Sequence, residues 1–315
     1  MRESGASSAA EELQWALTVS QLRHSGKSPL PRNSGCSVSS TDHSTGMTLM
    51  ERDEGAKDQN DELGKKITSW LSDQGYPLEM RVAQEMRKRK IGFHQSEYYE
   101  DPETGDHREI DLVGRIRLSR SNAEFPAFLY AVIEYKSSPG KPWILFSGGS
   151  DLHPVAQIAQ RFVLSTAVSR WGDFARTACE NNGNPFTELP LFRVEDDPAY
   201  TVVRSSLGKS REDVAYGAMT SVSKAAYAIS NENRAGAVAR IAVPIIVIDS
   251  PLFTCKLDSA GNTDLRRVPM GTVVWRKQIA RNSPPHSIVR IVTVSTLPDL
   301  CEELHATTKA LRGIF

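Results

Sequence analysis

The residues with the clearest chemical potential are two charges that end an apolar run. Residues 128–133 read Phe-Leu-Tyr-Ala-Val-Ile, and Glu134 and Lys136 follow with one residue between them. Side chains at positions i and i+2 of a β-strand share a face, so this carboxylate and this amine would lie together. Burying unpaired ions at a strand end costs several kcal/mol each. A cation bound by the carboxylate, or a phosphate beside the amine, would offset that cost.

A second carboxylate occupies the run before this one. Asp111 lies between Ile110 and Leu112, in a segment predicted to be a strand. Antiparallel pairing of the two strands would bring Asp111 beside Glu134. Two carboxylates at one point repel each other unless a cation neutralises them. Oxygen ligands favour a hard ion, so the predicted cofactor is Mg²⁺ or Mn²⁺.

The elements that must position these residues follow from periodicity. Leu78, Val82 and Met86 recur every four residues after Gly-Tyr-Pro, which predicts a helix over residues 78–89. Two strands are then predicted at residues 93–99 and 108–118, joined by turn residues as a hairpin. Ile110, Leu112 and Ile116 are expected on one side of the second strand. The apolar run at residues 128–135 is typical of a strand in the centre of a sheet.

This order of elements resembles the PD-(D/E)XK nuclease superfamily, which has the restriction-endonuclease-like fold. The pattern is a helix, a hairpin carrying an Asp, and a central strand ending in Glu-x-Lys, and it covers about residues 75–160. The resemblance implies that Asp111 and Glu134 are catalytic residues that hold the metal ion, together with the backbone carbonyl of Tyr135. It also implies that Lys136 orients or activates the attacking water.

The resemblance extends to two further side chains. The family often adds a Glu from the first helix, and Glu79 matches that position better than Glu85, which lies away from the apolar stripe. A helix after Glu-x-Lys often supplies a polar side chain, for which Gln157 is the choice, although an ordinary exposed amide is the alternative. Ile110 stands where the nominal pattern has proline.

The implied function is a divalent-metal-dependent nuclease that hydrolyses phosphodiester bonds, with DNA as the expected partner. One alternative is a catalytically inactive relative that keeps the fold as a binding or assembly module. Another is a solvated strand end, where a Glu–Lys pair contributes little to stability. The basic run at residues 87–90 could contact phosphates. It could equally be a solvated helix end that complements the helix dipole.

Composition limits these readings. The 315 residues carry 38 basic and 38 acidic side chains, so a basic field over the whole molecule is absent and nucleic acid must meet a local patch. The four cysteines lie far apart with no CxxC spacing, which favours reduced thiols in a cytoplasmic protein. No apolar run approaches the roughly 20 residues of a membrane helix.

The predicted fold class is α/β, with a central mixed β-sheet flanked by helices and a C-terminal sheet extension. Residues 1–60 are poor in large apolar side chains and are expected to be disordered. Translation from Met47 or Met50 is a hypothesis for this segment. Residues 61–315 are expected to form a single domain, with a nuclease-like core at about 75–180 and an extension at 181–315. The strands of the extension either continue the same sheet or form a small packed subdomain.

Overall fold

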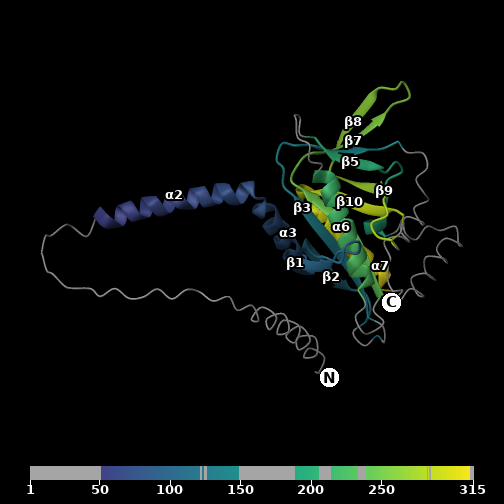
Figure 1. Ribbon diagram of the computed structural model, residues 1–315, viewed down its shortest axis with the longest axis horizontal. Coiled ribbons are helices and arrows are strands. Elements are labelled where there is room, and N and C mark those ends of the chain that lie inside the picture. Colours follow the sequence, from purple (N-terminus) through teal and green to yellow (C-terminus); the bar gives the residue numbers. More distant parts are fainter. Residues whose placement is uncertain are drawn as a thin grey trace, which may run out of the picture. The chain divides into compact units, whose positions relative to one another are not determined.

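The computed structural model describes residues 51–120, 123, 126–148, 189–205, 214–232, 239–281, 283 and 285–312 (Figure 1). The chain divides into two compact units, Met1–Lys57 and Asp58–Phe315. Helix α2 begins at Glu51, so residues 51–60 are helical where the sequence predicted disorder. Residues 1–50 lie outside the described residues. So do residues 149–188, which include Gln157 and the helix predicted there.

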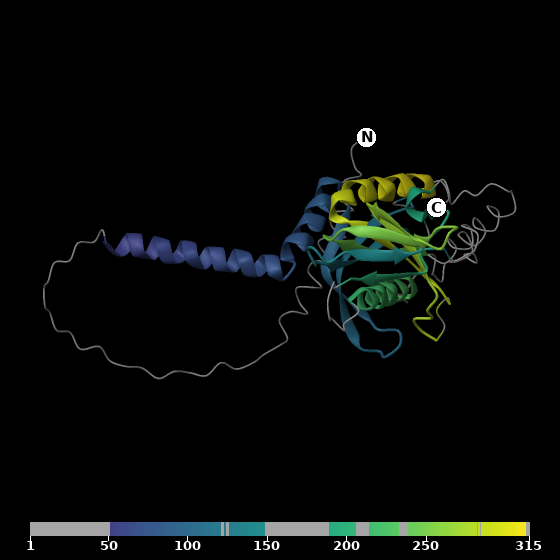
Figure 2. The same cartoon turned by 90° about the horizontal axis from the view of Figure 1, so that it is seen from above.

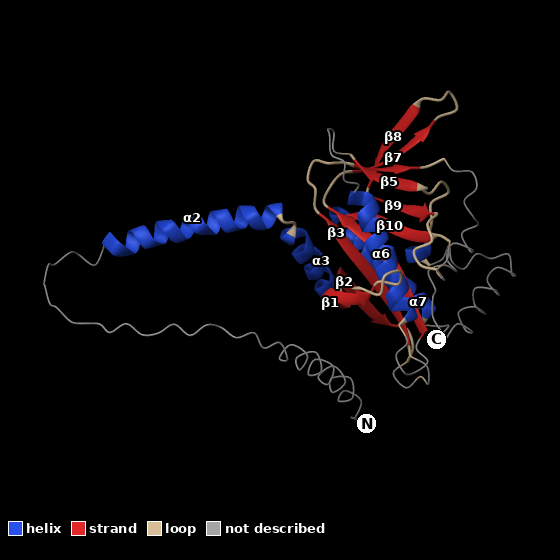
Figure 3. Cartoon of the chain, in the orientation of Figure 1, coloured by secondary structure: helices blue, strands red, loops and turns tan. Residues whose placement is uncertain are grey.

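The second unit combines helices with two mixed sheets, which confirms the expected α/β class with helices flanking a mixed sheet (Figure 3). After α2 (Glu51–Asp73), its helices are α3 (Tyr76–Lys88), α6 (Val214–Asn231) and α7 (Leu297–Leu311), with short 3-10 turns η2 (Pro190–Phe192) and η3 (Val294–Thr296). Its strands are β1 (Gly92–Glu100), β2 (His107–Arg117), β3 (Ala127–Lys136), β4 (Trp143–Phe146), β5 (Thr201–Arg204), β6 (Ala239–Ile248), β7 (Leu252–Leu257), β8 (Thr263–Val268), β9 (Met270–Trp275) and β10 (Ser287–Thr293). None of the helices in these ranges is long and apolar enough to cross a membrane.

Strand β3 holds a central position in the larger sheet. That sheet has six strands in the order β1-β2-β3-β6-β10-β9, so β3 is paired on both sides. It runs antiparallel to β2 over residues 128–133 and parallel to β6 over its whole length. A strand buried on both faces needs apolar side chains at nearly every position, which explains the unbroken run before Glu134.

The C-terminal strands divide between two sheets. Strands β6, β10 and β9 extend the main sheet, whereas β7 and β8 join β4 and β5 in a four-stranded sheet of order β5-β4-β7-β8. The two short strands β5 and β8 were not predicted from the sequence. Neither has the apolar alternation of a half-buried strand, and β8 in particular is largely exposed.

Helices cover both faces of the main sheet and leave β3 between two cores. Alternate side chains of β3, among them Ile133 and Tyr135, pack with α3 and α7, whereas Val132 packs with α6. In Figure 2 the yellow α7 lies above the sheet and the green α6 below it. Side-chain alternation therefore places Glu134 and Lys136 on the α6 side.

The β1–β2 ladder is interrupted at the position of Asp111. Pairing of Gln95 with Leu112 and of Glu97 with Ile110 flanks a gap, in which Ser96 has a left-handed φ of 52°. The expectation that Ile110 and Leu112 share a face was wrong. Ile110 packs on the α6 side and Leu112 on the α3 and α7 side, because this local irregularity breaks the alternation between them. Such irregularities are common beside active sites.

Glycine sets how closely the first turn of α3 approaches the end of β3. Gly75 precedes α3 with a φ of 83°, a conformation that costs other residues about 1–2 kcal/mol. A Cβ atom there would lie 3.0 Å from the Cβ of Ser137, which follows Lys136. The N-terminal turn of α3, which carries Glu79, is therefore packed against the segment leaving β3.

We expect Gly75→Ala to lower the free energy of unfolding by about 1–3 kcal/mol, because strain and a tight contact act together. Chemical denaturation followed by circular dichroism measures this. Gly140→Ala is the matched control, since Gly140 has a similar φ of 76° but nothing within 4 Å of the added Cβ. Equal destabilisation by both substitutions would show that the approach to Ser137 imposes no constraint.

Candidate functional site

Asp111 and Glu134 are brought together by the end of the β2–β3 ladder. The last pair of the ladder is Leu112 with Ile133, and the next position beyond it is Asp111 on β2 and Glu134 on β3. Asp111 Oδ2 accepts a hydrogen bond of 2.6 Å from the backbone N–H of Tyr135. The carboxylate of the hairpin is therefore fixed to the backbone of the Glu-Tyr-Lys segment.

Glu134 is held from two sides on the α6 face. Its side chain is only 9% exposed, and its Oε1 lies 2.6 Å from Lys136 Nζ. Its Oε2 accepts a hydrogen bond of 3.1 Å from Ser221 Oγ of α6. The i, i+2 spacing of Glu134 and Lys136 thus corresponds to a direct ion pair. The second partner of Glu134 comes from a helix more than 80 residues later in the chain.

Burial makes the charged forms of both acids unfavourable. It raises the pKa of Glu134, and Asp111 raises it further, although Lys136 and Ser221 act in the opposite direction. Burial also raises the pKa of Asp111, while the Tyr135 N–H and Lys136 oppose that change. The pKa of each carboxyl remains raised, so the ammonium group of Lys136 does not compensate for the desolvation of both acids. Perturbations of this kind concentrate at functional sites.

Two further acids share this electrostatic environment. The pKa of Glu79, in the first turn of α3, is raised by burial and then by Asp111 and Glu109, while Lys136 lowers it. Glu79 therefore lies close enough to Asp111, Glu109 and Lys136 to interact with them electrostatically. Glu109 was not predicted from the sequence. Its position two residues before Asp111 on one strand could have indicated it, as the same spacing did for Glu134 and Lys136.

The side chain of Tyr135 closes the opposite face of the sheet. Its hydroxyl is buried and has no hydrogen-bond partner within the described part of the chain. Burial raises the pKa of Tyr135, and Asp111 and Glu79 raise it further. The phenol therefore stays neutral beside the acids, and its ring packs on the α3 and α7 side of the sheet.

A serine and aspartate network fixes the segment that leaves β3. Asp249, directly after β6, accepts hydrogen bonds from Ser137 Oγ at 2.5 Å and from the Ser138 N–H at 2.8 Å. Ser250 Oγ donates to the carbonyl of Ser138 at 2.7 Å. Because β3 and β6 are parallel, their ends meet at one edge of the sheet. The same reasoning that selected Glu134 could have found Asp249, whereas Ser221 offered no sequence signal in a helix of small residues.

The donor set fits a hard divalent cation. Asp111 and Glu134 supply partly desolvated carboxylates, Asp111 makes Glu134 harder to ionise, and the peptide of Tyr135 adjoins both. Among the described residues, no three or more His, Cys, Asp or Glu side chains are grouped closely enough to form a metal site by themselves. The site would offer three protein ligands, two carboxylates and one backbone carbonyl. Mg²⁺ commonly completes so small a set of protein ligands with water.

Comparisons with protein-family models, with curated proteins and with solved structures give no match to this chain. The chemistry available at the site is that of its own residues. Those are the acids Asp111, Glu134 and Glu79, the amine of Lys136 and the backbone of Tyr135.

We expect Asp111→Asn to raise the melting temperature of the metal-free protein by a few degrees at pH 7. A carboxyl whose folded pKa is raised destabilises the folded state once it ionises, and the amide avoids that cost while still accepting from Tyr135. The difference should shrink as the pH falls through the raised pKa and vanish below the ordinary value near 3.8. Differential scanning fluorimetry from pH 3.5 to 8 measures it.

Added Mn²⁺ should reverse this order, because ligand binding to the folded state stabilises wild type more than the variant. Asp61→Asn, on the exposed part of α2, is the control and should not change the response. A variant that melts below wild type without metal, and gains equally from Mn²⁺, contradicts this view of the site.

We expect Ser221→Ala to weaken Mn²⁺ binding about tenfold, since residues that orient metal ligands typically contribute that much. Ser221→Thr keeps the hydroxyl and should restore most of the affinity. Ser223→Ala is the matched control on the same helix, because Ser223 Oγ has no partner in the described ranges. Isothermal titration calorimetry gives the dissociation constants. Identical constants for the Ser221→Ala and Ser223→Ala variants would remove Ser221 from the site.

Proposed function

We propose that this chain is a divalent-metal-dependent nuclease of the PD-(D/E)XK type, which hydrolyses phosphodiester bonds of DNA. The observation that carries the proposal is the meeting of Asp111, Glu134 and Lys136 at the end of one central strand. The order α3, β1–β2 hairpin and β3 supports it, because that superfamily has a helix, a hairpin carrying an Asp, and a central strand ending in Glu-x-Lys.

Three groups would hold the ion: the carboxylates of Asp111 and Glu134 and the backbone carbonyl of Tyr135. A bound Mg²⁺ or Mn²⁺ would supply charge neutralisation at a phosphate oxygen and lower the pKa of an attacking water. The two acids are held by the Tyr135 N–H and by Ser221, so their positions are largely set before anything binds. Such preorganisation is a main source of electrostatic catalysis.

Lys136 would act on the charge that develops in the transition state. Its side chain is 27% exposed, and its amine already lies in the site through its ion pair with Glu134. An ammonium fixed there stabilises negative charge on a pentacoordinate phosphorus group. Glu79 has a raised pKa and lies in the same field, so it is suited to accept a proton from water.

Exposed basic residues at the end of α3, just after it and on β2 support a nucleic-acid substrate. They are Arg87, Lys88, Lys90 and Arg115, of which Lys88 also pairs with Glu85. Arg87 lies over the ring of Phe93, with 5.3 Å between Cζ and the ring centroid. Exposed arginine and lysine side chains can bind phosphates without reading sequence, which provides affinity where the net charge of the chain is zero.

We expect wild-type protein to cut DNA with Mg²⁺ or Mn²⁺, and Asp111→Ala and Lys136→Ala to lose at least about a hundredfold of that activity. The assay is relaxation and linearisation of plasmid DNA, with a labelled oligonucleotide as second substrate. The matched control is Lys141→Ala, an exposed lysine five positions further along the chain.

The outcomes separate the two candidate functions. Cutting that persists in both the Asp111→Ala and the Lys136→Ala protein would refute the assignment of the site. Protein that binds DNA and never cuts it, with either metal, would favour the alternative of an inactive binding or assembly module.

A further inference from the structure

A cleft adjoins the candidate site on the α6 side of the sheet. It has a volume of about 550 Å³ and lies between the overhanging end of the β1–β2 hairpin and α6. Tyr99, Arg108 and Tyr216 contribute to its walls, and Ser221 and Glu109 line it as well. No spacing or motif in the sequence brings these residues together.

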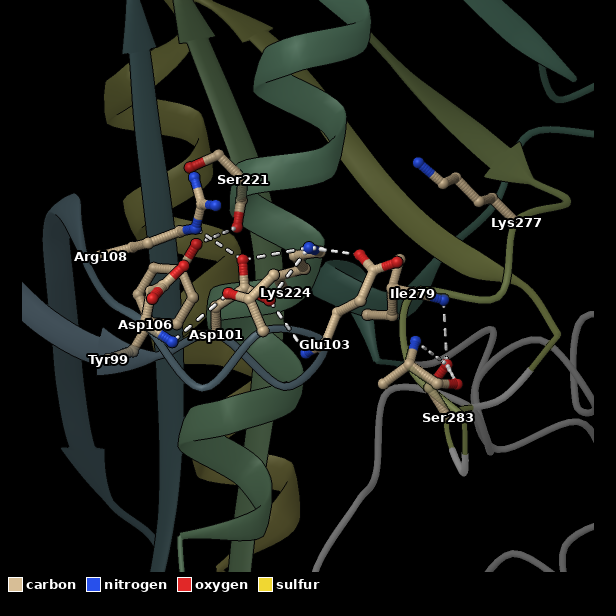
Figure 4. Close-up of polar contacts among 12 residues, drawn as sticks. Tyr99, Asp101, Glu103, Asp106, Arg108, Ser221, Lys224, Lys277, Ile279 and Ser283 are labelled. Atoms are coloured by element: carbon tan, nitrogen blue, oxygen red, sulfur yellow. Dashed lines mark hydrogen bonds and ion pairs between the residues drawn. The ribbon is translucent and has the colours of Figure 1, made fainter.

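Ion pairs hold the two walls of the cleft in place. Lys224 of α6 donates to both carboxylate oxygens of Asp101 at 3.0 Å, and Asp101 is fully buried in the hairpin turn. Arg108 reaches the same carboxylate, with 2.6 Å between its Nε and Asp101 Oδ2. The Tyr99 hydroxyl donates to the carbonyl of Ser221 at 3.4 Å. Figure 4 shows Lys224 of α6 and Arg108 of β2 both reaching Asp101, with the Tyr99–Ser221 contact beside them.

An aromatic side chain forms the outer part of the cleft. Tyr216 is 48% exposed, although large aromatic side chains are usually buried. It packs edge-on against Trp275, with ring centroids 5.5 Å apart. Lys277 Nζ lies 4.5 Å from the Tyr216 centroid and contacts its hydroxyl. The ring is thus backed by Trp275 and Lys277, and it stands in the same cleft as the half-exposed guanidinium of Arg108.

The inner end of the cleft is continuous with the candidate site. Ser221 lines the cleft and also donates to Glu134 Oε2. Glu109 lines it too and acts electrostatically on Asp111. A molecule in the cleft would therefore lie beside the acids proposed to hold the metal.

We propose that this cleft receives one unpaired base of the substrate strand, so that the protein acts on single-stranded or locally opened DNA. The proposal rests on the proposed function. A volume of about 550 Å³ accommodates a nucleotide, as small-molecule pockets of this size do, whereas a paired duplex is too wide to enter. Tyrosine rings and arginine planes are the surfaces on which unpaired bases stack.

The charges in the cleft favour base stacking over phosphate binding. The cations Arg108 and Lys224 are balanced by the acids Asp101 and Glu109. Stacking depends weakly on salt, whereas contacts to phosphates release counterions and depend strongly on it. Loss of the Tyr216 ring should therefore weaken binding without changing its salt dependence.

The test is fluorescence anisotropy with a labelled single-stranded oligonucleotide and a blunt duplex of the same length, in EDTA so that nothing is cut. We expect Tyr216→Ala to weaken single-strand binding about tenfold, to leave duplex binding unchanged and to keep the salt slope of wild type. Tyr216→Phe keeps the ring and should bind like wild type. Tyr200→Ala is the matched control, because Tyr200 is also 48% exposed and lies outside the cleft lining.

Three results would overturn the proposal: no measurable single-strand binding by wild type, equal binding by the Tyr216→Ala and Tyr200→Ala proteins, or an equal loss on duplex. Its failure is distinguishable from failure of the nuclease assignment. If cutting depends on Asp111 but Tyr216→Ala does not change single-strand binding, only the role of the cleft is rejected. Single-strand binding that depends on Tyr216, without any cutting, rejects the nuclease activity alone.

Discussion

The structure depends on one unfavourable arrangement, the placement of two electrostatically interacting carboxylates on adjacent strands, where both are largely shielded from water. Asp111 and Glu134 are each made harder to ionise by burial, and Asp111 adds to the cost for Glu134. A fold has no structural need for such a pair, since apolar side chains of similar size would be less costly. The compensating contacts, from the Tyr135 N–H, Lys136 and Ser221, are all directed at these acids and leave a net cost. A cation bound between the acids would remove the remainder.

The rest of the fold can be understood as the support for that point. Parallel pairing with β6 fixes where β3 ends, and Asp249 at the end of β6 holds the segment that follows. The interruption of the β1–β2 ladder at Ser96 allows Asp111 to leave the regular alternation of β2. Helix α6 supplies Ser221 to Glu134 and, through Lys224, anchors the hairpin that carries Asp111. Stability is commonly given up at sites of function in this way.

Local sequence patterns predicted much of this arrangement, and their limits have physical causes. The first helix, the hairpin and the central strand followed from periodicity and turn residues, because those signals act over neighbouring positions. The i, i+2 spacing of Glu134 and Lys136 likewise predicted a shared face. Ser221 and Lys224 could not be predicted, because their roles arise from contacts across more than 80 residues of chain. The break in alternation at Asp111 was missed since no glycine or proline marks it.

The most direct test of the account is the anomalous difference map of a crystal soaked in Mn²⁺. If Asp111 and Glu134 hold the ion, the map has one strong peak within about 2.3 Å of oxygens from both residues, with the Tyr135 carbonyl as a third protein ligand. A map with no peak at these carboxylates under saturating Mn²⁺, or with a peak only at other residues, would contradict the account.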